Sequence, residues 1–214
     1  MKIFKRVLLL LLLLIIVSVV YNYPKLNILS GYSAKNTASS VFVAGRTLEF
    51  TDTTDNNFSP VNLASDAIDL EKRIATSSAF GLLTRKAVHR NGLGTVLTLT
   101  EEDETANYLS PRRLEPDNVT PYPYGNAPQK DTGFANINYG ILKNAVDSLF
   151  HTRNKSRAVV IIYKDQIIAE RYANGFTKNS KLLGWSMTKS ILSTVYGVLQ
   201  QQGKINVQDK APIA

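Results

Sequence analysis

The chain opens with basic residues followed by a long apolar run. Lys2, Lys5 and Arg6 precede side chains that are almost all apolar over residues 7–20. As a helix this run spans about 21 Å, which is shorter than a bilayer core of about 30 Å. The pattern predicts either a cleaved signal peptide or an uncleaved membrane anchor for residues 1–23. In both cases the basic end stays in the cytoplasm, so we expect the rest of the chain in the periplasm or cell envelope.

The next segments are polar and interrupted by turn-forming residues. Residues 24–40, which are rich in Ser, Asn and Lys, are predicted to form an irregular tether. The apolar residues 41–44, which stand before Gly45, predict a short strand. Residues 51–60 are dense in Asp, Asn and Thr and predict a loop.

A hairpin and a connector follow. Residues 79–88 and 95–100 flank Asn91-Gly92, a dipeptide typical of tight hairpin turns, and residues 95–100 alternate apolar and polar side chains. Residues 110–128 contain five prolines, which remove backbone donors and fix φ, so they predict a connector. We therefore expect a β-rich extension with its connector at residues 41–128, and a second domain at residues 129–214.

The second domain has a different pattern. Residues 138–150 carry apolar side chains at helical spacing. Residues 158–163 and 167–172 are β-branched runs around a short polar turn and predict a hairpin. Residues 186–202, which end at Gly203, predict a buried helix with the apolar stripe Ile191, Leu192, Val195, Tyr196, Val198 and Leu199. Helix, hairpin, loop and helix in this order predict an α+β fold with an antiparallel sheet packed with helices.

Composition narrows the range of functions. The chain has 214 residues, a formal net charge of +8 and no cysteine. The absence of cysteine excludes disulfides, thiolate metal sites and cysteine nucleophiles. His89 and His151 are the only histidines, so we predict neither a metal site nor a cofactor. The basic residues are spread along the chain and form no stripe with aromatics, which disfavours nucleic acid as a partner. The sequence does not indicate an oligomeric state.

One motif combines a candidate nucleophile with a candidate base. Ser186-Met187-Thr188-Lys189 is the only Ser-x-x-Lys in the chain. On the order of one such match arises by chance in a chain of this length, so the position of the motif at a predicted helix start gives it weight. Residues three apart share a helix face, so the Lys189 amine can reach the Ser186 hydroxyl. The unpaired first-turn N–H of Ser186 can stabilise an oxyanion.

Two interpretations of the motif are open. If Lys189 is neutral, its amine can take the Ser186 proton and activate the hydroxyl as a nucleophile. This requires desolvation, because a lysine has a reference pKa of about 10.4 and the helix dipole contributes less than about one unit. In the other interpretation Ser186 only caps its helix, and Lys189 is an exposed helix residue.

Three stretches give the chain a family resemblance. They are LLGWSMTKSILSTVYGVLQQQGKINVQDK (residues 182–210), AVVIIYKDQIIAERYANGF (residues 158–176) and NGLGTVLTL with PYPYGN (residues 91–99 and 121–126). Residues 41–214 resemble the class C β-lactamase-related serine hydrolases, a superfamily that includes penicillin-binding peptidases and 6-aminohexanoate-dimer hydrolases. The resemblance implies a β-lactamase/transpeptidase-like fold. It also implies that Ser186 is the acylated nucleophile and Lys189 its base or proton relay.

The chain departs from this family in one respect. The family also uses a Tyr-x-Asn or Ser-x-Asn element and a Lys-Thr-Gly or His-x-Gly strand, both downstream of the serine helix. Residues 172–174 match Tyr-x-Asn by letters, but they lie upstream at the end of a predicted strand, so we interpret them as structural. We therefore expect the N-terminal fragment of a hydrolase, incomplete in its fold and without significant turnover.

Three functions are compatible with these observations. The first is a membrane-tethered serine hydrolase that acts on a small-molecule or peptide amide or ester through an acyl-serine. The second is a non-catalytic, envelope-anchored binding module with the same fold. The third is an anchored domain in which Ser-x-x-Lys is a coincidence. The sequence does not distinguish β-lactams, D-Ala peptides, linear amides and esters as substrates.

Overall fold

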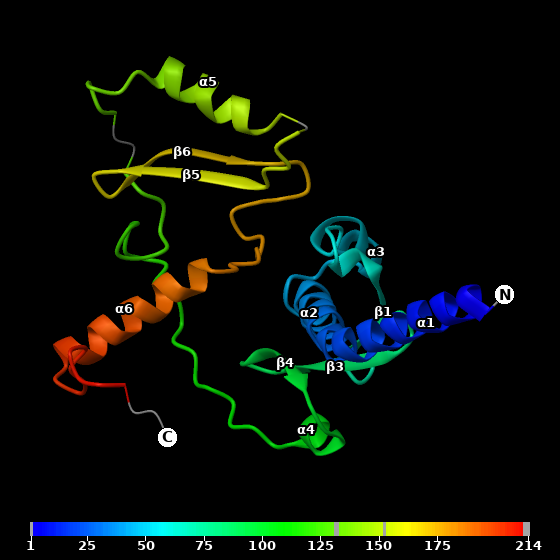
Figure 1. Ribbon diagram of the computed structural model, residues 1–214. Helices are drawn as coiled ribbons and strands as arrows, with labels where there is room; N and C mark the ends of the chain where they lie inside the picture. Colours follow the sequence, from blue (N-terminus) through cyan, green and yellow to red (C-terminus); the bar gives the residue numbers. More distant parts are fainter. Residues whose placement is uncertain (1, 131–132, 152, 212–214) are drawn as a thin grey trace. The chain divides into compact units, whose positions relative to one another are not determined.

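The computed structural model describes residues 2–130, 133–151 and 153–211. Helices make up 40% and strands 19% of a mixed α+β structure with antiparallel sheets (Figure 1). The predicted α+β class with an antiparallel sheet is confirmed. The chain divides into two compact units, Met1–Ser180 and Lys181–Ala214.

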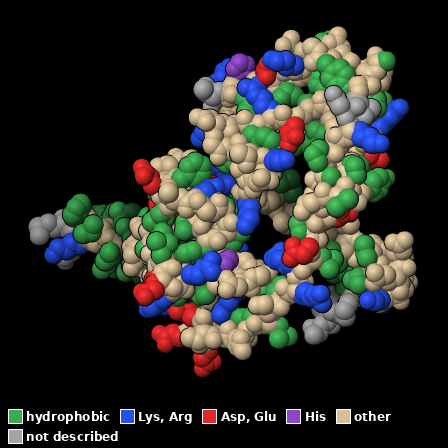
Figure 2. Space-filling model, turned by 180° about the vertical axis from the view of Figure 1, so that it is seen from behind, with side chains coloured by type: hydrophobic (Ala, Val, Ile, Leu, Met, Phe, Trp, Pro, Cys, Tyr) green, Lys and Arg blue, Asp and Glu red, His purple; other side chains and the backbone are tan. Residues whose placement is uncertain are grey.

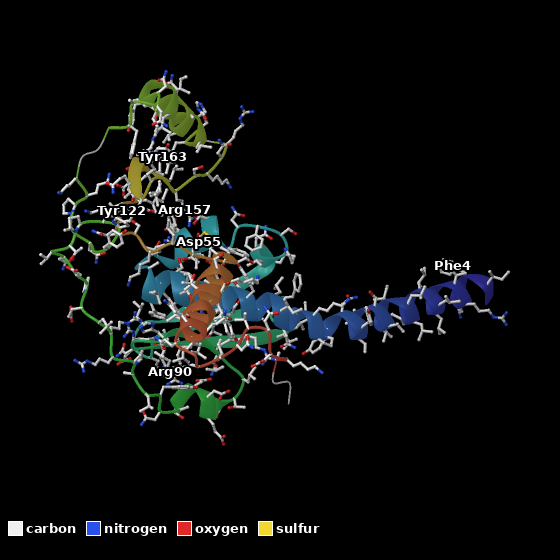
Figure 3. The ribbon with its side chains drawn as sticks, turned by 90° about the vertical axis from the view of Figure 1, so that its left-hand side faces the viewer. Phe4, Asp55, Arg90, Tyr122, Arg157 and Tyr163 are labelled. Carbon is white, nitrogen blue, oxygen red and sulfur yellow. The ribbon has the colours of Figure 1, made fainter. Side chains whose placement is uncertain are left out.

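The first unit begins with a continuous helical stretch. It consists of α1 (Lys2–Asn22), the 3-10 turn η1 (Tyr23–Lys25), α2 (Leu26–Ala38) and the π turn η2 (Ser39–Val43). Within it, an 18-residue window has a mean hydropathy of 2.8 and is 0% buried. Figure 2 shows hydrophobic side chains coating this helix, and Phe4 lies near its free end in Figure 3. Such a helix is compatible with a signal sequence or a membrane span.

Two predictions are wrong: that residues 24–40 form an irregular tether, and that residues 41–44 form a short strand. Residues 26–38 are the helix α2, and residues 41–44 belong to the π turn η2 and its end. Ser, Asn and Gly have weak helix propensity, which is why the segment reads as a loop. Tertiary packing overrides that propensity here, because eight residues of α2 are buried.

Four antiparallel strands pack beside α2 in sequential order. They are β1 (Ala64–Asp69), β2 (Ile74–Ala79), β3 (Leu83–Arg90) and β4 (Gly94–Thr98). The predicted Asn91-Gly92 hairpin is confirmed, with Arg90 paired to Gly94 and Gly92 at φ 78°. The run predicted over residues 79–88 is instead broken by a turn at Phe80-Gly81, where both residues have positive φ.

The core between α2 and this sheet is built from alanines. Ala34 and Ala38 of α2 and Ala75 and Ala87 of the sheet are all 0% exposed. A Cβ on Gly31 would lie 3.3 Å from Leu97 Cδ2, so the helix also approaches the sheet closely at this glycine. Small side chains on both surfaces allow this close approach.

The segment predicted as a loop at residues 51–60 is partly helical. It contains the end of a short helical run formed by α3 (Leu48–Phe50) and the π turn η3 (Thr51–Asp55). Thr47 caps this run by accepting a hydrogen bond from Phe50 N at 3.0 Å. A 3-10 turn, η4 (Val61–Leu63), then leads into β1.

After β4 the chain forms the short helix α4 (Glu101–Thr105), which Thr100 and Asp103 close with a reciprocal capping box. Residues 110–128 contain no named helix or strand, and their one bridge joins Pro121 to Ala127, so the predicted lack of regular secondary structure in this segment is confirmed. The first unit ends with α5 (Tyr139–Leu149) and the hairpin β5 (Ala158–Tyr163) and β6 (Gln166–Tyr172), close to the predicted bounds.

The second unit contains α6 (Met187–Gln201), which Gly203 follows with φ 67°. The predicted helix is confirmed in its bounds, but the prediction that it is buried is wrong. None of its residues is buried, and its stripe is exposed at Ile191 (66%), Leu192 (55%), Val195 (48%), Tyr196 (49%) and Val198 (46%).

Candidate functional site

The side chains of Ser186 and Lys189 are in direct contact. Lys189 Nζ donates a hydrogen bond to Ser186 Oγ at 2.9 Å. Ser186 occupies the N-cap position of α6, with φ −68° and ψ −11°, yet its side chain makes no capping hydrogen bond. The hydroxyl therefore faces the amine instead of the backbone donors of its own helix, as the motif spacing predicts.

The turn before α6 fixes this arrangement. Trp185, which directly precedes Ser186, has φ 45°, a left-handed conformation that is uncommon for a large side chain. Thr188 Oγ1 donates a hydrogen bond to the Trp185 carbonyl at 2.7 Å, and Met187 N donates to Gly184 O at 2.9 Å. Backbone strain of about 1–3 kcal/mol immediately before a candidate nucleophile is characteristic of functional sites.

Solvent reaches both groups of the pair. Ser186 and Lys189 are exposed, as are the neighbouring side chains of Trp185 (60%) and Met187 (67%). The second unit by itself therefore does not supply the desolvation that the nucleophile interpretation requires. Activation of Ser186 therefore requires additional surface that excludes water from the pair.

The Tyr-x-Asn letters at residues 172–174 lie at the end of β6 in the first unit. Tyr172 donates a hydrogen bond from its hydroxyl to Glu170 Oε1 on the same strand. This hydrogen bond to the Glu170 carboxylate, together with desolvation, raises the pKa of Tyr172 to about 12. A tyrosine held neutral by a neighbour on its own strand fits the structural interpretation of these residues.

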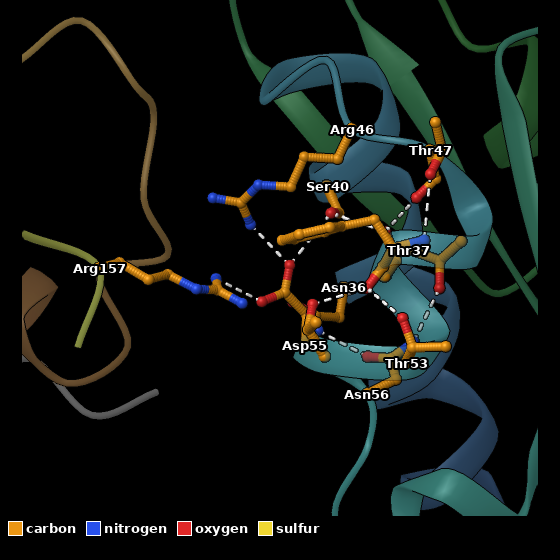
Figure 4. Close-up of polar contacts among 12 residues, drawn as sticks. Asn36, Thr37, Ser40, Arg46, Thr47, Thr53, Asp55, Asn56 and Arg157 are labelled. Carbon is orange, nitrogen blue, oxygen red and sulfur yellow. Dashed lines mark hydrogen bonds and ion pairs between the residues drawn. The ribbon is translucent and has the colours of Figure 1, made fainter. Parts of the chain in front are cut away.

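A second polar cluster, which the sequence-based predictions missed, lies between α2, η3 and β1, and Figure 4 shows its members Asn36, Thr37 and Asn56. Asp66 accepts hydrogen bonds from Ser33 Oγ at 2.7 and 2.8 Å, from Thr37 Oγ1 at 3.0 Å and from Asn56 Nδ2 at 2.9 Å. Ser33, Thr37 and Asn56 are buried. Three donors, one of them the Ser33 hydroxyl shared between both carboxylate oxygens, stabilise the Asp66 carboxylate inside the unit.

The carboxyl group of Asp52 shares a hydrogen bond with Asp66 at the edge of this cluster. Desolvation raises the pKa of Asp52 to about 6, and the charge and hydrogen bond of Asp66 act in the same direction. The negative charge of Asp66 disfavours the ionised form of Asp52, so Asp52 retains its proton into mildly acidic pH.

Asp55 is the centre of a charged group in the same region. Its side chain, 4% exposed, forms ion pairs with Arg46 (Oδ2–Nη1, 2.6 Å) and Arg157 (Oδ1–Nη1, 2.5 Å). Both guanidinium groups also lie 5.3–5.7 Å from the ring centroids of Phe50 and Phe176. The two arginines thus join the α2 region to the segments that flank the β5–β6 hairpin. Their positive charges interact with Asp55 and with the two aromatic rings inside the fold.

The helical spacing of small polar residues was the available signal for this cluster. Ser33, Asn36, Thr37 and Ser40 repeat at intervals of three and four, as residues on one helix face do. In the described residues no group of three or more His, Cys, Asp and Glu side chains could hold a metal ion. Because its side chains are buried and bond to one another, we assign the cluster a role in packing, and Ser186 with Lys189 remains the candidate site.

Comparisons of this chain with protein-family models, with curated proteins and with solved structures found no match. The family resemblance described above therefore stays a hypothesis, supported by the three sequence stretches and by the geometry of the Ser-x-x-Lys pair.

Proposed function

We propose that this chain belongs to a β-lactamase-related serine hydrolase that acts on an amide or ester through an acyl-serine. The observation that carries the proposal is the 2.9 Å hydrogen bond from Lys189 Nζ to Ser186 Oγ, at a helix start where the serine makes no capping bond. The α5, β5–β6 and α6 order is compatible with a β-lactamase-like fold. The apolar α1 with its basic start supports placing the catalytic domain outside the cytoplasm.

The proposed reaction begins with Lys189 in its neutral form. Its amine takes the proton of the Ser186 hydroxyl while Oγ attacks the carbonyl carbon of the substrate. The Ser186 N–H stabilises the resulting oxyanion. When the tetrahedral intermediate collapses, the bond to the amine or alcohol breaks, and the leaving group takes the proton from Lys189. Attack by water on the acyl ester then releases the acid and restores the serine.

Water must be kept from the pair for this chemistry to proceed. The resemblance implies that a Tyr-x-Asn or Ser-x-Asn element and a Lys-Thr-Gly or His-x-Gly strand complete such a site. The exposed apolar stripe of α6, with Ile191 at 66% and Leu192 at 55%, offers a surface on which covering elements can pack. Because Ser186 and Lys189 are exposed, we propose that the pair has no significant turnover until such elements cover it.

Covalent labelling tests the assignment of the nucleophile. The protein translated from the complete gene is treated with a fluorophosphonate and, separately, with a fluorescent penicillin. Labelling should be lost in Ser186→Ala and retained in Ser190→Ala, which alters an exposed serine of the same helix. Equal labelling of both variants, or steady turnover by the 214 residues alone, would contradict the proposal.

A non-catalytic, envelope-anchored binding module is the second candidate. The exposure of Ser186, Lys189 and the α6 stripe favours it, because an exposed pair lacks the desolvation that catalysis needs. The downstream gene sequence separates the two candidates. Tyr-x-Asn and Lys-Thr-Gly or His-x-Gly motifs there support the hydrolase, whereas a stop codon after Ala214 supports the binding module.

A further inference from the structure

Exposed apolar side chains gather at the end of the four-stranded sheet next to the end of α1. The β2–β3 turn at this end contains Phe80 and Leu82, whose side chains are 60% and 59% exposed. The Tyr23 hydroxyl, one residue beyond α1, donates a hydrogen bond to the Leu82 carbonyl at 3.4 Å. This turn therefore lies beside the point where the apolar helix meets the rest of its unit.

The backbone conformation of this turn is unusual for a phenylalanine. Phe80 and Gly81 have φ values of 55° and 67°, a left-handed conformation that favours Gly, Asn and Asp. A bulky phenylalanine at such a position is strained, and it is also exposed to water. Neither feature stabilises the fold, so the side chain is best explained by a contact outside the chain.

The charge distribution at this end indicates the partner. Residues 20–30, 58–64 and 79–84, which meet here, contain no acidic residue, and Lys25 is their single charged side chain. The β1–β2 turn, Leu70-Glu71-Lys72-Arg73, is charged and lies at the opposite end of the sheet. An uncharged apolar tip with tyrosine and one lysine is the composition of a membrane interface.

We propose that Phe80 and Leu82 insert into the interfacial region of the bilayer that α1 enters, and so hold the first unit against the outer leaflet. This inference rests on α1 being retained as a membrane anchor. Tyr21 and Tyr23, with the Lys25 amine 4.1 Å from the Tyr21 ring centroid, mark the same interfacial level.

The continuity of the helices makes lipid the occupant of this surface. The 3-10 turn η1 joins α1 to α2 without an irregular linker, and Leu26 N donates to the Tyr23 and Pro24 carbonyls across it. Because α2 is packed against the sheet through buried alanines, the sheet cannot swing away from the end of α1. Once α1 lies in a bilayer, the β2–β3 turn is therefore held at the lipid surface.

Position-specific fluorescence tests this proposal. The chain has no cysteine, so a single environment-sensitive dye can be placed by Phe80→Cys, by Leu70→Cys at the charged turn, or by Leu12→Cys within α1. Each labelled chain is reconstituted into vesicles of neutral and anionic phospholipid, with and without a quencher attached near the lipid headgroup. Leu70 is 68% exposed and so matches Phe80 as a control.

The proposal expects a blue shift and a loss of emission with the lipid-borne quencher at position 80, and neither at position 70. If the dye at position 80 shows water-like emission while the dye at position 12 is blue-shifted as in a bilayer, the insertion of the turn is overturned but the anchoring by α1 is not. Water-like emission at position 12 would overturn the anchoring of α1, and the proposal with it. A blue shift at position 80 that the lipid-borne quencher does not reduce would assign the surface to a second copy of the chain instead.

Discussion

Asp55 and Arg157 form an ion pair with 2.5 Å between Oδ1 and Nη1, although they lie far apart in the sequence. Asp55 ends the helical run after α2, and Arg157 directly precedes β5. Figure 3 shows the two labelled residues close together, and the pair ties the β5–β6 hairpin to the α2 region. Since the side chain of Asp55 is 4% exposed, little solvent screens this contact.

The first prediction concerns this ion pair. Asp55→Ala should lower the free energy of unfolding by about 3–5 kcal/mol, because it removes the largely buried carboxylate that pairs with both Arg46 and Arg157. Lys143→Ala, which removes an exposed pair with Asp147, should cost less than about 1 kcal/mol. Urea unfolding in detergent, followed by pulse proteolysis, measures both. Equal losses in the two variants would show that the Asp55 contacts add nothing beyond a surface pair.

A second prediction concerns the dependence of stability on pH. The pKa of Asp52 is raised from 3.8 to about 6 in the folded protein, so the native state binds more protons than the unfolded chain between these values. The free energy of unfolding should therefore fall as the pH rises from about 4 to about 6, and level off above it. Asp52→Asn should flatten this part of the profile, measured by urea unfolding at a series of pH values. A profile that Asp52→Asn leaves unchanged would assign the titration to another group.

A third prediction concerns the alanine core. Ala34→Leu should destabilise the first unit by about 1–3 kcal/mol or more, because Ala34 is 0% exposed and the added carbons have no space between α2 and the sheet. Ala67→Leu, at an exposed position of β1, should change stability by less than about 0.5 kcal/mol. Thermal unfolding of the two variants is the measurement. Similar melting temperatures would indicate that α2 does not pack as closely as described.

A fourth prediction concerns catalysis and follows from the proposed function. In the protein translated from the complete gene, Lys189→Ala should slow acylation of Ser186 by at least about 10²-fold, since it removes the general base. Lys204→Ala, an exposed lysine beyond the end of α6, should leave the rate unchanged. The rate of covalent labelling by a fluorescent penicillin gives the comparison. An unchanged rate in Lys189→Ala would leave the 2.9 Å contact without a catalytic role.

Local pattern was sufficient for several elements. The apolar run of α1, the helical spacing in α5 and α6, the β-branched hairpin β5–β6 and the Asn91-Gly92 turn are each encoded in a short window, because side-chain periodicity and turn chemistry act between near neighbours. The contact between Ser186 and Lys189 belongs to the same class, since it depends only on residues three apart on one helix.

Only the tertiary structure decided the rest. The polar segment of α2 is a helix because its small side chains fit against a sheet that comes later in the chain. The pairing of Asp55 with Arg157, and of Asp52 with Asp66, likewise depends on contacts between distant segments. The exposure of α6 could not be predicted from its sequence either. An apolar stripe gives a helix a face that another surface can bury, but whether that face is buried depends on a second element that covers it.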